Sequence, residues 1–319
     1  MCIRDSTMLA GLVSVAYTDV ANGIIILISF VIAIPIFLVK AGGFEGMAIS
    51  FAEMGKNDHM NFWGVYSGMD IINFCLPSFL LIMGDANMYQ RFFASKDVKG
   101  AKSATKTLIV AVLIAELMIV VAAWIASSMI PDAEVGKYVL IYASHEFLPP
   151  FIGAIMMTTI VGIIISTADS YLLVPTTTLM RDIYLNYFNK NADQAKIVFL
   201  SRVLVIVLGI IAYAVSLGFA KSAGFFERAL YAYTIYGAAI TPSLVAALFW
   251  KGATKEGAIA SILVGTLTTL LWKESSFIMN IVPDDIYGNM DEVLPAITFS
   301  VISLVLVSLF TQKKNLKEY

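Results

Sequence analysis

The stretch FIGAIMMTTIVGIIISTADSYLLVPTTTLM, residues 151–180, decides the fold because it contains a single charged side chain, Asp169. A helix needs about 20 apolar residues to cross the hydrocarbon core of a bilayer. This run is longer than that, and Pro149 and Pro150 stand directly before it. It therefore predicts a membrane-spanning helix with a few polar groups enclosed in its middle.

Runs of the same kind fill the rest of the 319 residues, so we predict an all-α, polytopic membrane protein. The chain is 59% hydrophobic and 14% charged, with a mean hydropathy of +0.83, whereas soluble domains are roughly half apolar and a quarter charged. The runs are continuous, which argues against a transmembrane barrel of alternating residues. About eight spans are expected, at 9–39, 69–90, 105–130, 151–180, 197–219, 226–250, 257–272 and 293–311.

The remaining composition argues against several other classes of protein. A net charge of −2, from 21 basic and 23 acidic residues, provides no basic surface for nucleic acid. Two cysteines and two histidines cannot build a disulfide framework, a zinc ribbon or a histidine-rich metal centre. We therefore expect no nucleic-acid partner and no histidine-based metal catalysis, and the apolar runs indicate that the lipid bilayer surrounds the chain.

Basic residues alternate between the two sides of the predicted bundle. Both termini and the second, fourth and sixth connections carry 15 of the 21 Lys and Arg residues. Because basic loops stay on the cytoplasmic side, this bias predicts a multi-pass protein of the cell membrane with a cytoplasmic C-terminus.

Ionisable groups within membrane spans are expensive and are functional candidates by default. Asp19, Asp85, Glu116 and Asp169 qualify, although some could lie near helix ends. Ser166 lies about 22 Å along its helix, at 1.5 Å per residue, and Thr167 and the carbonyl of Ile163 are near it. These three neutral oxygens suit an alkali cation, or the hydroxyls could simply bond to their own helix backbone.

The second span contains its own interruption. Leu76-Pro77-Ser78 is expected to break the helix after Asn73, and the stretch MGDAN follows at 83–87. Discontinuous helices of this kind line the binding sites of transporters. A simple packing kink is the alternative, because Pro and Gly are common in membrane helices.

Four stretches in order resemble the sodium:solute symporter family. They are YTDV at 17–20 with Asn22, the segment from Gly84 to Arg91 with ASKD at 94–97, STADS at 166–170 followed by RDIY at 181–184, and TKEGA at 254–258. The resemblance covers nearly the whole chain from about residue 9. It implies the LeuT-type fold of two inverted five-helix repeats, and this chain matches it from the fifth core helix onward.

The resemblance also implies site residues and a coupling ion. Ile163, Ser166 and Thr167 would bind Na⁺, and Asp19, Asp169 and Ser170 match a second cation or proton site, where Asp169 departs from the usual Ser. Substrate candidates on the broken sixth core helix are Ser78, Phe79, Ile82 and Asp85, and on the tenth helix Tyr233. The solute would be a small polar or anionic molecule of the sugar, amino acid or carboxylate class, carried by alternating access.

The motif order also gives expectations about the extent of the chain. Residues 1–6, MCIRDS, look like a non-native segment, and 7–319 like a partial symporter domain that lacks the first four core helices. Those helices would be partners of the same protein, and its oligomeric state is left open.

Three other functions share some of these sequence features. Proton coupling or a non-transporting membrane subunit would fit the same spans. An intramembrane aspartyl protease would place two aspartates on neighbouring spans, as Asp19 and Asp85 are here. Thr18 separates Tyr17 from Asp19, however, and Ile82 replaces the first Gly of the protease motif, so that match fails in detail.

Overall fold

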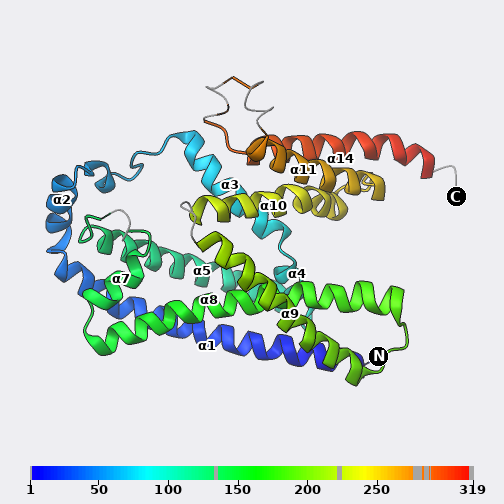
Figure 1. Ribbon diagram of the computed structural model, residues 1–319, viewed down its shortest axis with the longest axis horizontal. Coiled ribbons are helices and arrows are strands. Elements are labelled where there is room, and N and C mark those ends of the chain that lie inside the picture. The colour runs from blue at the N-terminus through cyan, green and yellow to red at the C-terminus, as the bar shows by residue number, and fades with distance from the viewer. Residues whose placement is uncertain are drawn as a thin grey trace. The chain divides into compact units, whose positions relative to one another are not determined.

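The computed structural model describes residues 2–132, 136–220, 225–275, 282–283, 287 and 289–315, and every regular element within these ranges is a helix (Figure 1). The first half contains α1 (Cys2–Lys40), α2 (Gly43–Glu53), η1 (Asn57–Met60), α3 (Gly68–Gly84), α4 (Ala86–Phe93), α5 (Val98–Ser127) and α7 (Val139–Glu146). The second half contains α8 (Pro150–Thr178), the π-helix η2 (Leu179–Phe188), α9 (Gln194–Ala220), α10 (Phe225–Phe249), α11 (Lys255–Glu274) and α14 (Val293–Asn315).

Seven helices in the described part of the chain are long and apolar enough to cross a membrane. They coincide with seven of the eight expected spans and confirm a polytopic, all-helical membrane protein. The range 257–272 forms α11, which is 20 residues long but is not in this set. The helix of the first expected span begins further N-terminally, at Cys2, and the part of it found to be long and apolar enough to cross a membrane among the described residues is Asp19–Lys40.

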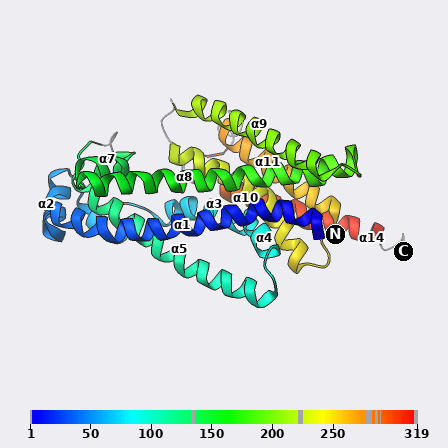
Figure 2. The same cartoon turned by 90° about the horizontal axis from the view of Figure 1, so that it is seen from below.

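The chain divides into two compact units. One contains residues 1–65 and 89–213, and the other contains 66–88 and 214–319. In the first unit, α1 and α8 run antiparallel and side by side (Figures 1 and 2).

Polar rungs join α1 to α8. The hydroxyl oxygens of Ser29 and Thr159 are 2.8 Å apart in a buried contact. Asn22 Nδ2 donates to the Gly162 carbonyl at 3.5 Å. Residue numbers increase along α1 from Asn22 to Ser29 while those of their partners on α8 decrease from Gly162 to Thr159. These two contacts therefore fix the antiparallel register of the helix pair.

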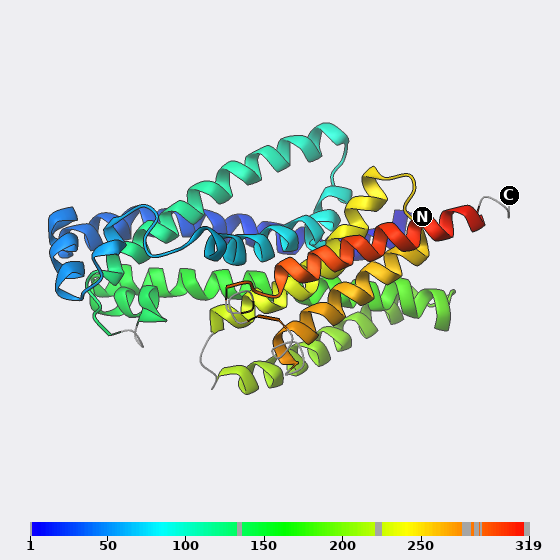
Figure 3. The same cartoon turned by 90° about the horizontal axis from the view of Figure 1, so that it is seen from above.

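The apolar core of the first unit lies toward the end of α1 that carries Phe30 and Phe37. Both side chains are buried, and they pack with residues of four other helices: Met47 and Phe51 of α2, Ala122, Ile125 and Ala126 of α5, Ala143 of α7, and Met156 of α8. The N-terminal part of α5 diverges from α1 (Figures 2 and 3), and its side chains are mostly exposed. The core therefore anchors one end of these helices, and the polar groups described below lie beyond it.

In the second unit, α3, α10, α11 and α14 pack against one another (Figure 3). Small residues and hydroxyls make the close contacts between them. Thr241 donates to the Leu80 carbonyl at 2.6 Å, and the hydroxyls of Ser261 and Ser300 are 2.8 Å apart. Gly237 lies directly against Leu80. Because lipid gives no hydrophobic drive for helices to associate, such close approach is what stabilises helix pairs in membranes.

The interruption of the second span is not where the sequence predicted it. Pro77 lies inside the continuous helix α3, and the break comes at Asp85, whose backbone is extended between α3 and α4. A proline can stay within a membrane helix when its surroundings satisfy the freed backbone groups. At the actual break, Tyr236 donates to the Gly84 carbonyl and accepts from the Ala86 N–H, each at 3.3 Å.

Two of the loop motifs have a simple structural role as helix caps. Asp97 precedes α5 and accepts the Gly100 N–H at 2.6 Å, and Thr254 precedes α11 and accepts the Gly257 N–H at 3.1 Å. Side-chain oxygens at this position satisfy N–H groups that have no partner within the helix. The ASKD and TKEGA motifs therefore set where these two helices begin.

We expect Gly237→Ala to destabilise the second unit. The added Cβ would lie 2.7 Å from Leu80 Cβ and 3.0 Å from Leu81 N, so α3 and α10 must move apart. Such overpacking costs about 1–3 kcal/mol, which should lower the unfolding temperature of the purified protein. Gly23→Ala is the matched control, since nothing lies within 4 Å of its added Cβ. An equal loss of stability in both variants would contradict the packing described here.

Candidate cation site

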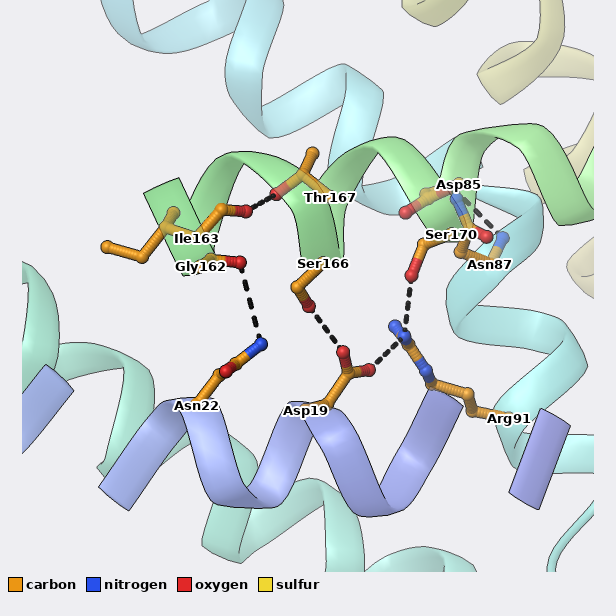
Figure 4. Close-up of polar contacts among 10 residues, drawn as sticks. All are labelled: Asp19, Asn22, Asp85, Asn87, Arg91, Gly162, Ile163, Ser166, Thr167 and Ser170. Carbon is orange, nitrogen blue, oxygen red and sulfur yellow. Dashed lines mark hydrogen bonds and ion pairs between the residues drawn. The ribbon is translucent and has the colours of Figure 1, made fainter. Parts of the chain in front are cut away.

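The carboxylate of Asp19 is the centre of a polar network that joins three helices (Figure 4). Asp19 lies on α1, and its Oδ1 accepts the hydroxyl proton of Ser166 on α8. Its Oδ2 lies 2.7 Å from a guanidinium nitrogen of Arg91 on α4. The same nitrogen donates to Ser170 Oγ at 3.0 Å. Ser166 and Ser170 are four residues apart, so they lie on the same face of α8.

The network balances a charge within an apolar span. Asp19 has apolar stretches of α1 on both sides of it in the sequence, and its side chain is 26% exposed, against 38% for Arg91. An ionised carboxylate in such surroundings needs a partner of opposite charge or several hydrogen bonds. Here it has both, because Arg91 neutralises it and Ser166 donates to it.

The three oxygens predicted to bind the first sodium ion do not all face the same neighbours. Thr167 Oγ1 donates to the Ile163 carbonyl at 2.9 Å, so these two groups are together. Ser166 instead points toward α1 and donates to Asp19 (Figure 4). Thr167 is exposed. All three groups therefore lie within one turn of α8, and each hydroxyl is engaged as a donor.

The residues predicted for a second cation are only partly together. Asp19 and Ser170 share the Arg91 guanidinium, and Ser170 is buried. Asp169 is exposed and takes no part in this network.

The predicted substrate residues lie in the second unit. On α3, Phe79 and Ile82 are 59% and 61% exposed, and Ser78 is half-buried. Asp85 Oδ1 accepts the backbone N–H of Asn87 at 3.0 Å and its side-chain amide at 3.2 Å, which caps α4 (Figure 4). Tyr233 on α10 is 36% exposed.

The sequence did not connect two residues with the contacts that they make here. Arg91 belongs to the family-like segment 84–91 and to a basic connection, and nothing in the sequence pairs it with Asp19, although an intramembrane carboxylate calls for a nearby cation. Tyr236 is, with Tyr231 and Tyr233, one of three tyrosines on the tenth helix that the resemblance offers as substrate candidates, and no sequence signal selects it for the break at Asp85. In the structure, the Tyr236 hydroxyl bonds to the residue before Asp85 and to the residue after it.

Comparison with known proteins identifies the family. The model of the sodium:solute symporter family matches residues 4–265. The chain belongs to the sodium:solute symporter family. A solved structure of a substrate-bound, outward-open Na⁺-coupled sialic acid symporter has the same fold, with a TM-score of 0.66 at 16% identity over 95% of this chain and 62% of that one.

Curated relatives from this symporter family are transporters and not enzymes, as expected. The osmoregulated proline transporter OpuE of Bacillus subtilis is 25% identical over 98% of this chain and 62% of its own length. The high-affinity proline transporter PutP of the same organism is 27% identical over 96% and 63%. The sodium/proline symporter of Escherichia coli is 23% identical over 95% and 59%. The chain thus spans about three-fifths of the length of these relatives.

We expect Asp19→Asn to destabilise the first unit and Asp169→Asn to leave its stability unchanged. The first change leaves Arg91 without its anionic partner, whereas the second removes an exposed charge outside the network. Loss of a charged hydrogen-bond partner typically costs about 1–3 kcal/mol. Thermal unfolding of both purified variants in one detergent checks this, and a larger effect of Asp169→Asn would refute the network.

Proposed function

We propose that the protein is a secondary active transporter that couples the inward movement of a small polar solute to sodium. Proline is the first solute to test, because the relatives from Bacillus subtilis and Escherichia coli are named as proline transporters. The family match and the sodium coupling in the names of relatives support the choice of ion.

One observation carries this proposal: α1 and α8 place Asp19, Ser166 and Ser170 together within membrane spans. Carboxylate, hydroxyl and carbonyl oxygens are the ligands that hard cations prefer. Ile163 and Thr167, one turn of helix or less from Ser166, supply further oxygens. The second site, at Asp19, Asp169 and Ser170, would accept another cation or a proton.

Coupling follows if sodium binds one conformation more tightly than another. The ion is transported, and its differential affinity for the two conformations supplies the free energy that shifts their populations. In this chain, ligands on α1 and α8 would hold those two helices together while the ion is bound. A change in their spacing would then release the ion.

The solute would bind where the second span is interrupted. The extended backbone at Asp85 and the two exposed apolar side chains Phe79 and Ile82 lie on the same span. With Ser78 and Tyr233 they offer polar and apolar contacts of the kind that small-molecule sites combine. We also propose that 7–319 is part of the symporter domain and that the C-terminus is cytoplasmic, following the bias of the basic loops.

The full-length protein in proteoliposomes should accumulate labelled proline when an inward sodium gradient is applied. Replacing sodium by potassium should abolish accumulation. A response to a proton gradient alone would instead support proton coupling. Failure to move any of a panel of amino acids, sugars and carboxylates would support a non-transporting subunit.

We expect Ser166→Ala combined with Thr167→Ala to raise the half-saturating sodium concentration by at least tenfold, because two candidate ligand oxygens are lost. Thr158→Ala is the matched control, since Thr158 is an exposed residue of α8 that bonds its own backbone at Ala154 just as Thr167 bonds Ile163. Sodium-dependent uptake that survives intact in the double variant would refute the site assignment.

A further inference from the structure

The guanidinium group of Arg91 already places a positive charge next to the Asp19 carboxylate. One guanidinium nitrogen of Arg91 is 2.7 Å from Asp19 Oδ2 and 3.0 Å from Ser170 Oγ. Asp19 and Ser170 are two of the three residues assigned above to a second cation. Arg91 therefore contacts the same oxygens that such a cation would need.

The two oxygens of Asp19 are both in use. Oδ1 accepts the Ser166 hydroxyl and Oδ2 accepts Arg91. A sodium ion added beside them would bring a second positive charge to a carboxylate whose charge is already balanced. Like charges a few ångströms apart repel one another, so binding of both cations to one carboxylate is disfavoured. The ion and the guanidinium should therefore exclude one another.

Arg91 belongs to a short helix whose contact with α8 would change if sodium replaced the guanidinium. It lies on α4, an eight-residue helix that follows the extended residue Asp85. The preceding residue, Gln90, donates to Thr177 Oγ1 on α8 at 3.1 Å. Adjacent residues of α4 thus bond to α8 at two positions, and only the Arg91 contact would be lost when an ion takes its place.

We propose that Arg91 is a tethered counter-cation that occupies Asp19 and Ser170 in the ion-free protein and is displaced when sodium binds there. This proposal rests on the proposed sodium coupling. It adds that Arg91 weakens sodium binding by competing for the same oxygens, and that its release loosens α4 from α8. Arg91 thus sets the affinity for sodium and is not itself a sodium ligand.

The direct test is equilibrium binding of ²²Na⁺ to the purified full-length protein without solute, at constant ionic strength with choline. Arg91→Ala should bind sodium at least tenfold more tightly than the unaltered protein, which corresponds to about 1.4 kcal/mol. Lys99→Ala is the matched control, because it removes one exposed positive charge eight residues further along the chain. Its sodium affinity should equal that of the unaltered protein.

Chemical rescue separates competition from a structural role. In Arg91→Ala, guanidinium chloride at a few millimolar, far below the molar range that unfolds proteins, should occupy the vacated place and raise the apparent sodium Kd. The unaltered protein should show no such response. A purely structural arginine would give no competition between guanidinium and sodium.

A measurement on the unaltered protein covers the case in which Arg91→Ala fails to fold. Phenylglyoxal modifies accessible arginines, so sodium should accelerate the labelling of Arg91, read by peptide mass spectrometry, while exposed Arg202 reacts at a constant rate. Unchanged or slower labelling of Arg91, or a folded Arg91→Ala with equal or weaker sodium affinity, would overturn the proposal. Absence of sodium binding in the unaltered protein would instead overturn the proposed function.

Discussion

The carboxylate of Asp19 is the constraint on which the arrangement of the first unit depends. A charge within an apolar span must be compensated, and compensation comes from Ser166 on α8 and Arg91 on α4. These bonds set how α1 lies against α8, and the rungs at Asn22 and Ser29 follow in the same antiparallel register. The apolar core around Phe30 and Phe37 then packs the opposite part of the pair.

The second unit achieves close packing by a different route. Contact between its helices depends on small residues such as Gly237 and on hydroxyls that bond across the interface, as Thr241 does to Leu80. Tyr236 uses the same principle at the Asp85 break, where it satisfies one carbonyl and one N–H that the helix leaves free. Irregular backbone within a membrane is stable only when its polar groups are satisfied in this way.

The sequence predicted the spans well because hydrophobic length is a local property of the chain. It also selected Asp19 and Ser166, because polar groups stand out within apolar runs, whereas Ser170 came only from the family resemblance. It could not predict that Arg91 pairs with Asp19. A basic residue at the end of a span fits the cytoplasmic bias of basic loops whichever way its side chain points. The break was misplaced at Pro77 for a related reason: whether proline interrupts a helix depends on tertiary partners, which the local sequence does not specify.

The hydrogen bonds of the site limit how tightly it could hold an ion. Ser166 and Thr167 both donate their hydroxyl protons, to Asp19 and to the Ile163 carbonyl. A hydroxyl can rotate and present its lone pairs, but each rotation breaks a bond that stabilises the ion-free form. Sodium would therefore exchange one set of contacts for another, and its net affinity would be the difference between the two. That difference should be modest, which suits a transporter because the ion has to be released on the other side of the membrane.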